Sequence, residues 1–390
     1  MISSNISLIL SLSFLIWFSP FVAQWLRLPI PVIEIALGSA LAYFGFVGHN
    51  EYFDLVANVG FLYLMFLAGM EVDLKALTRS SRFVLRRALL FLATTTFFSI
   101  TGGMVLDFHP IVLISLPLIS IGLLASLSKT YGKEEKWLEI AFITGILGEI
   151  LSIAVLTIFD AASTTGFNAH LLEKIAWLVG VLMAVYLLYK ALQLLFWWFP
   201  ELKRALVPRF DTSDRDIRLA MALFFILISV MLYLELELAL GSFIAGMAIA
   251  AFFKHEKALE EKISGFGFGF LVPIFFIHVG ASFDLDALKV DGVVSGALLI
   301  TAVMIGARVL ASFMLKAVEG SFNALLSGLS LSMPLTLLIA VATIGYETKL
   351  LDMLNYYQLI LASIFEILIV MSLIKFLMEK RKNKPPGQSS

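Results

Sequence analysis

Three ionisable side chains lie in the middle of long apolar stretches, where an ionised group is costly. Glu149 stands in TGILGEILSIAVL, Arg308 in VMIGARVLASF and Glu366 in SIFEILIV. Burial disfavours the charged form of a carboxylate, so a proton and a cation can compete for Glu149. An arginine keeps its charge when buried and needs a partner, so we expect Arg308 to compensate charge when no cation is bound.

Each of these residues also has a purely structural interpretation. Glu149 could be locked in an ion pair, and Arg308 could sit in a fixed pair or extend its head group towards the membrane surface. Glu366 could titrate as a second acid or simply neutralise Arg308. His278, in FFIHVG, could sense pH or be held by a hydrogen bond.

The surrounding sequence predicts membrane-spanning helices. The chain has 390 residues, of which 60% are hydrophobic and 15% charged, whereas soluble domains carry roughly a quarter charged residues. Apolar runs long enough to span a bilayer as helices recur throughout, and they are too continuous for barrel strands. We therefore expect an all-α polytopic protein of about 13 transmembrane helices, near 6–25, 31–47, 54–70, 84–105, 110–128, 137–159, 171–198, 217–234, 238–253, 266–281, 292–315, 323–345 and 355–378.

Positive charge is distributed very unevenly between the two sides that these spans define. One side collects 23 of the 28 Lys and Arg residues and the other side only 3, with Lys190 and Arg308 inside spans. The positive-inside rule then places the N-terminus outside and the C-terminus in the cytoplasm. The first apolar run follows no basic segment, so it is expected to stay as a helix and not to be cleaved as a signal peptide.

The second half of the sequence echoes the first. Leu-Gly-Ser at 37–39 returns at 240–242, GMEVDLKAL at 69–77 returns as GASFDLDAL at 280–288, and GEIL at 148–151 returns as FEIL at 365–368. The order is kept, so spans 1–6 match spans 8–13, and an odd connector inverts the second copy. We expect a first repeat over 1–160, a linker helix and loop over 161–215, a second repeat over 216–379 and a short basic tail over 380–390.

Two of the spans carry helix-breaking residues at corresponding places in the two repeats. Span 5 has Pro117 and Gly122 around Ser120, and span 12 has Pro334. Proline removes a backbone hydrogen bond, and interrupted helices in both repeats point to an ion site. Ordinary proline kinks are the alternative. Ser120, Thr144 (about one turn before Glu149) and the freed carbonyls would complete an oxygen shell around a cation bound to Glu149.

Several classes of function find no support in the sequence. There is no cysteine, so thiolate metal sites and iron–sulfur clusters are excluded. A net charge of −1 does not suggest a nucleic-acid partner. No cofactor fingerprint or arrangement of nucleophile and base is present, so we expect neither an enzyme nor a resident cofactor.

Four segments, in this order, resemble one family of transporters. They are FLAGMEVDL at 66–74, LGSFIAGMAIA at 240–250, EEKISGFGFGFLVPIFFIHVG at 260–280 and GAR at 306–308. With these segments the chain resembles the monovalent cation:proton antiporter superfamily, especially its second branch, over nearly its whole length. The resemblance implies exchange of Na⁺, or alternatively K⁺ or Li⁺, for H⁺ in a bacterial inner membrane, in the service of pH homeostasis.

The resemblance also implies an architecture and a site. It implies a homodimer in which a mobile core with crossed, broken spans 5 and 12 moves against a scaffold in an elevator-like cycle. Members of the family carry an Asp-Asp, Asn-Asp or Gln-Asp pair in span 6, where this chain has Gly148-Glu149, and Arg308 stands where Asp-Asp members have a lysine. This pattern is closer to the electroneutral members, with Glu366 as a candidate second acid. Some relatives have a C-terminal nucleotide-binding domain, for which this chain ends too early.

Two further functions stay open on the sequence alone. One is a cation-coupled symporter for an organic anion on the same inverted-repeat plan, with Arg308 as the anion ligand. The other is a transport-inactive membrane sensor or subunit, which the missing polar neighbour at Gly148 keeps open.

Overall fold

The computed structural model describes most of the chain, and the part that it describes is helical. The described residues are 2–26, 28–46, 50–71, 79–132, 134–165, scattered positions between 173 and 198, 214–234, 236, 238–253 and 257–382. The first half contains α1 (Ile2–Leu26), α2 (Ile30–Tyr43), α3 (Glu51–Glu71), α5 (Arg82–Val105), α6 (Pro110–Ser115), α7 (Leu124–Tyr131) and α8 (Lys136–Thr165).

The second half continues the all-helical pattern. It contains α11 (Arg215–Tyr233), α12 (Leu238–Phe253), α13 (Lys257–Phe266), the π-helical η1 (Gly267–Leu271), α14 (Val272–Ala281), the 3₁₀ helix η2 (Leu285–Lys289), α15 (Val293–Ala311), the 3₁₀ helix η3 (Ser312–Met314), α16 (Lys316–Glu319), α17 (Ser321–Ser330), α18 (Leu335–Glu347) and α19 (Met353–Lys382). No residue that the structure describes belongs to a strand.

Nine of the helical segments in the described part of the chain are long and apolar enough to cross a membrane. The helices α2 and α12 are apolar but shorter, and the predicted span 5 is divided between α6 and α7. The predicted span 12 is likewise divided between α17 and α18. Every predicted span thus corresponds to helical segments, except 171–198, which falls mostly outside the described residues. The prediction of an all-α polytopic membrane protein is confirmed.

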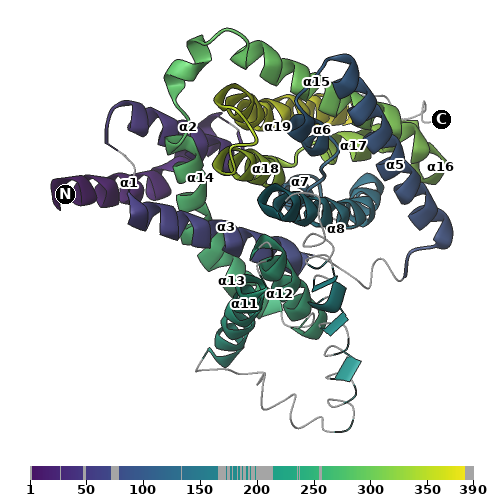
Figure 1. Ribbon diagram of the computed structural model, residues 1–390. Coiled ribbons are helices and arrows are strands. Elements are labelled where there is room, and N and C mark those ends of the chain that lie inside the picture. Colours follow the sequence, from purple (N-terminus) through teal and green to yellow (C-terminus); the bar gives the residue numbers. More distant parts are fainter. Residues whose placement is uncertain are drawn as a thin grey trace. The chain divides into compact units, whose positions relative to one another are not determined.

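The chain divides into two compact units, and each takes helices from both halves of the sequence. The first unit combines Met1–Leu74 with Thr157–Leu285, and the second combines Lys75–Leu156 with Asp286–Ser390. Figure 1 labels the helices of both units along the chain. The predicted repeats over 1–160 and 216–379 therefore each contribute to both units, and the repeat relationship itself stays a prediction.

Close glycine contacts hold the first unit together. Gly69 of α3 lies against the backbone carbonyl of Phe243 on α12, and Gly280 of α14 lies against the carbonyl of Ile35 on α2. A methyl group at either glycine would overlap that carbonyl, so only glycine allows the helices to come so close. Gly69 and Gly280 open the two echoed segments, so corresponding residues perform the same packing task.

The second unit is built around α15. This helix packs against α5, α17 and α19, while α18 packs against α19 and also contacts the short helix α6 (Figure 1). Pro110 is the first residue of α6, where a missing N–H does no harm. The side chain of Ser81 caps α5 by accepting from the backbone N–H of Val84. The unit thus places the short helix α17 beside α15, which carries the buried Arg308, and the short helix α6 beside α18.

Candidate functional site

Two helices of the second unit are interrupted, as the prolines predict. Regular structure stops after Ser115 and resumes at Leu124, and it stops again after Ser330 and resumes at Leu335. Pro334 is the N-cap of α18. The prediction that spans 5 and 12 are broken is confirmed. Each break frees backbone N–H and C=O groups, which within a membrane must find partners in the protein.

Side chains of α8 take up the freed N–H groups of the first break. The carboxylate of Glu149 accepts from the backbone N–H of Ile121 at 2.6 Å and from the hydroxyl of Ser120 at 3.4 Å. One turn further along α8, the hydroxyl oxygen of Ser152 accepts from the N–H of Ile119 at 2.8 Å. Glu149 is completely buried. The donors aimed at this carboxylate stabilise its charged form, which a cation would need.

Glycines on α8 let the unwound segment approach Glu149. A methyl group at Gly148 would come within 2.8 Å of the side chain of Ile119, and one at Gly145 within 2.6 Å of the side chain of Ile121. Both distances are shorter than side chains tolerate without movement. Gly148 therefore has a physical role of its own, because a polar side chain there would push the unwound segment away from α8.

Arg308 of α15 takes up the carbonyls that the two breaks release. Its guanidinium donates to the carbonyls of Met304 at 2.9 Å, of Leu331 at 3.2 Å and of Leu118. Leu118 follows the end of α6, and Leu331 is the C-cap of α17. Helix C-termini carry partial negative charge, so the buried guanidinium compensates two half-helix ends at once.

Glu366 of α19 lies beside Arg308 without a hydrogen bond to it. The distance from Arg308 Nη1 to Glu366 Oε1 is 3.8 Å, and both side chains are completely buried. Neither carboxylate oxygen has a hydrogen-bond partner among the residues that the structure describes. The two side chains thus form an ion pair without a hydrogen bond, and both interpretations of Glu366, a second titrating acid or a group that neutralises Arg308, stay open.

The predicted ligand set is brought together in part. Ser120 contacts Glu149 as expected. Thr144 is completely buried on α8, but its hydroxyl has no hydrogen-bond partner in the described part of the chain, and no hydrogen bond joins it to Glu149. Ser152 and the two freed amides were missed. The sequence signal for Ser152 was its position three residues after Glu149, which puts both side chains on one face of a helix.

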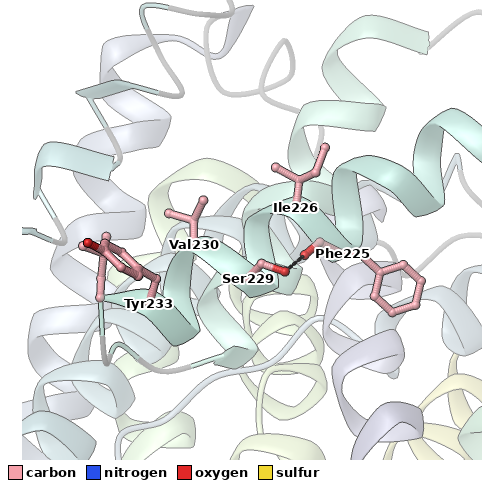
Figure 2. A pocket seen from close by; sticks show the side chains of 6 residues that line it. Phe225, Ile226, Ser229, Val230 and Tyr233 are labelled. Atoms are coloured by element: carbon pink, nitrogen blue, oxygen red, sulfur yellow. Dashed lines mark hydrogen bonds between the residues drawn. The ribbon is translucent and has the colours of Figure 1, made fainter.

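Two other features belong to the first unit. His278 Nε2 lies 2.8 Å from Asp54 Oδ1, and its ring meets that of Phe53 edge-on at 4.8 Å, so this histidine is held by neighbours. Figure 2 shows a surface hollow whose described lining comes from α11 and its C-cap residue Leu234. The hydroxyl of Ser229 there donates to the carbonyl of Phe225 at 2.8 Å. No charged side chain is among the described lining residues, so the hollow offers no ion chemistry comparable to that around Glu149.

Comparison with known proteins gives matches over almost the entire chain. The family model described as "Sodium/hydrogen exchanger, transmembrane" matches residues 9–380. Among curated proteins, YjbQ of Bacillus subtilis is 24% identical over 84% of this chain, and the high-affinity Na⁺/H⁺ antiporter NhaS3 of Synechocystis is 27% identical over 70% of it. The chain covers 55% of the length of YjbQ and 62% of that of NhaS3.

A solved structure has the same fold. The sodium proton antiporter MjNhaP1 from Methanocaldococcus jannaschii, determined at pH 8, matches with a TM-score of 0.69 over 98% of this chain and 99% of its own, at 18% sequence identity. At 18% identity this likeness shows the fold alone. The chemistry of the site has to be argued from the residues of this chain.

Proposed function

The chain belongs to the sodium/hydrogen exchanger family, and on that premise we propose that it exchanges a monovalent cation for protons across a membrane by secondary active antiport. Na⁺ is the first candidate, because NhaS3 and MjNhaP1 are named for it, and K⁺ and Li⁺ are the alternatives. The observation that carries the proposal is the buried carboxylate of Glu149 at the break between α6 and α7, with Ile121 and Ser120 as its donors.

Glu149 binds either the cation or a proton. A completely buried carboxylate can lose its solvation only in exchange for a proton, a cation or hydrogen-bond donors, so the two substrates compete for one group. Oxygen ligands suit a hard cation such as Na⁺. The hydroxyls of Ser120 and Thr144 and the carbonyls of the unwound segment supply them, with Thr144 turning to the ion by a rotation of its side chain.

Arg308 supplies the fixed positive charge of the empty site. The carbonyls of Leu118 and Leu331 hold it at the C-terminal ends of α6 and α17, and the carbonyl of Met304 ties it to its own helix. Its charge balances the two helix ends in the empty site. The same three acceptors already engage the guanidinium. The alternative of an organic-anion symporter, in which Arg308 binds the anion, therefore lacks an observation in its favour.

The second unit is the carrier in this proposal and the first unit the scaffold. Glu149, Arg308 and Glu366 all belong to the second unit, and so do the hydrogen-bond partners of Glu149 and Arg308. An elevator-like movement of this unit would carry the site without breaking its internal contacts. Assembly as a homodimer, a bacterial inner membrane and a cytoplasmic C-terminus complete the proposal.

The test uses purified protein in liposomes that hold a pH-sensitive dye. A proton gradient is imposed, and Na⁺, Li⁺ and K⁺ are added in turn. We expect one of these cations to dissipate the gradient with wild type and with Glu139→Gln, which removes an exposed carboxylate from the same helix. We expect no response with Glu149→Gln. Near-normal exchange by Glu149→Gln would reject Glu149 as the transport carboxylate, and no response of wild type to any cation would favour a transport-inactive sensor or subunit.

A further inference from the structure

Glu366 is a buried acid that the proposed exchange does not yet use. It sits near the middle of α19, completely buried, and both of its carboxylate oxygens lack a hydrogen-bond partner among the described residues. The hydroxyl of Ser332, in the unwound stretch between α17 and α18, is a neighbouring donor, but its contact with Glu366 falls short of full hydrogen-bond geometry. The Ser332 hydroxyl is thus the only nearby neutral donor for a negative charge on Glu366 that these contacts identify among the described residues.

Arg308 does not donate a hydrogen bond to Glu366 in this conformation. The 3.8 Å between Arg308 Nη1 and Glu366 Oε1 exceeds hydrogen-bond distance. The guanidinium instead donates hydrogen bonds to the carbonyls of Met304, Leu331 and Leu118. An ionised carboxylate buried without hydrogen bonds is strongly disfavoured, even near a cation, unless the geometry is good.

Glu149 has the opposite environment within the same unit. Its carboxylate accepts hydrogen bonds from the amide N–H of Ile121 and the hydroxyl of Ser120. The carboxylate of Glu366 accepts a hydrogen bond neither from a backbone amide nor from the guanidinium of Arg308 in the described structure. Pairs of buried acids with unequal environments divide the roles of proton holder and charge holder between them. From this contrast, and resting on the proposed antiport, we infer that Glu366 is a second proton-exchanging group of the transport cycle, with Arg308 as the partner of its ionised form.

The two acids are coupled through the unwound segment. The carbonyl of Leu118 accepts from Arg308, and three residues further along the N–H of Ile121 donates to Glu149. A cation bound at Glu149 draws carbonyls of this segment towards itself, and Arg308 then loses an acceptor. A movement of about 1 Å brings Nη1 within the 2.7–2.9 Å of a charge-assisted hydrogen bond to Glu366.

The step balances in protons and charge. The O–H bond of the Glu366 carboxyl breaks, its proton leaves to the water on the side to which the site is open, and the carboxylate accepts a hydrogen bond from Arg308. Together with the proton displaced from Glu149, two protons leave for each monovalent cation that binds. One net charge therefore crosses the membrane in each cycle, and exchange depends on the membrane potential.

The experiment measures voltage dependence in proteoliposomes with an imposed Na⁺ gradient and a potential set by K⁺ and valinomycin. Wild type, Glu366→Gln and the charge-retaining control Glu366→Asp are compared, with Li⁺ replacing Na⁺ if Li⁺ is the better substrate. We expect the direction of proton flux in wild type and Glu366→Asp to reverse at a potential that follows the Na⁺ gradient. We expect Glu366→Gln to exchange without sensitivity to the potential.

A second measurement tests the inference even if the Glu366→Gln protein folds but does not transport. Calorimetric titration with Na⁺ in two buffers of different ionisation enthalpy counts the protons released for each cation bound. We expect one proton fewer from Glu366→Gln than from wild type, and an equal count would overturn the inference. Glutamine imitates the protonated acid, so a Glu366→Gln protein that does not fold would also overturn it.

The inference and the proposed function fail in different ways. Wild type that exchanges Na⁺ without any response to the potential, or a Glu366→Gln protein with the voltage dependence of wild type, removes Glu366 from the cycle and leaves the antiport intact. Wild type that exchanges no cation overturns both.

Discussion

The backbone N–H of Ile121 donates to Oε2 of Glu149 at 2.6 Å. The donor belongs to the unwound stretch between α6 and α7, and the acceptor to the middle of α8. The carboxylate thereby satisfies an amide that the broken helix leaves without a partner, and the same amide stabilises the charge that a cation requires. One hydrogen bond thus contributes both to the stability of the broken helix and to the proposed binding of a cation. Variants of neighbouring residues should therefore distinguish effects on stability from effects on exchange.

Ser152→Ala tests the structural side of this arrangement. The N–H of Ile119 then loses its 2.8 Å acceptor in a buried position, and an unsatisfied buried amide costs about 1–3 kcal/mol. We expect a lower thermal midpoint of the detergent-solubilised protein and a lower exchange rate, because the segment beside Glu149 is less well fixed.

Ser372→Ala is the matched control for this change. Its hydroxyl lies on an exposed face of α19 and donates within its own helix to Leu368. Equal midpoints for the Ser152→Ala and Ser372→Ala proteins would contradict a capping role for Ser152.

Gly148→Asn restores a polar neighbour of the kind that the family resemblance implies. We expect it to impair exchange here, because the first carbon of the new side chain comes within 2.8 Å of Ile119 and displaces the segment that carries Ser120. Overpacking of this kind costs about 1–3 kcal/mol. The Na⁺ concentration for half-maximal dequenching in liposomes is the readout, and it should rise.

Gly306→Ala is the control for an added side chain, since nothing lies within 4 Å of that position. Introducing Ile119→Ala into the Gly148→Asn protein should recover part of the loss by removing the outer atoms of the overlapping side chain. A Gly148→Asn protein that exchanges faster than wild type would show that the glycine is a missing ligand and not a packing requirement.

Arg308→Gln should destabilise the protein more than Ser152→Ala or Gly148→Asn does. It removes the charge that compensates two half-helix ends and leaves the carbonyls of Leu118 and Leu331 short of donors. Breaking a buried charged arrangement costs about 3–5 kcal/mol. Denaturant unfolding followed by tryptophan fluorescence measures the free energy of unfolding.

Arg308→Lys is the informative partner of this variant. Lysine keeps the charge but lacks the planar fork that reaches several carbonyls at once. We expect an intermediate stability. If Arg308→Lys and Arg308→Gln are equally unstable, the fork geometry dominates, and if Arg308→Lys equals wild type, compensation of charge alone is sufficient.

Glu319 makes stability depend on pH. It ends the short helix α16 between two membrane spans, is 7% exposed, and neither of its carboxylate oxygens has a hydrogen-bond partner in the described structure. The nearby hydroxyl of Ser327 donates to the carbonyl of Trp137 at 2.8 Å. Burial raises the pKa of the Glu319 carboxyl from 4.5 to about 8, against smaller opposing effects of Ser327 and Lys136.

The sign of the effect follows from proton binding. Between pH 4.5 and about 8 the folded protein retains the Glu319 proton that the unfolded chain releases, so the contribution of Glu319 to the free energy of unfolding falls as pH rises through this window. It is fully present below pH 4.5. We expect Glu319→Gln to flatten the fall in thermal midpoint towards pH 8, with Glu139→Gln on an exposed face of α8 as control. An unchanged slope in Glu319→Gln would contradict the assignment.

The sequence by itself determined the helices, the places where two of them break, and the acid at one break. These features are local: span length follows from runs of apolar residues, and the interruptions follow from Pro117 and Pro334, whose missing N–H no tertiary contact can replace. Glu149 was identifiable because an ionisable side chain within an apolar membrane span is costly and is therefore a candidate functional group.

Only the tertiary structure decided which partner each polar group has. Glu149 finds its amide 28 residues away, and Arg308 finds the carbonyl of Leu118 190 residues away, in preference to Glu366 beside it. It likewise decided that Gly148 makes room for Ile119 and that each compact unit draws on both halves of the chain. Helix periodicity cannot determine such pairings, because they depend on how distant helices pack and on which freed backbone groups come within hydrogen-bond distance.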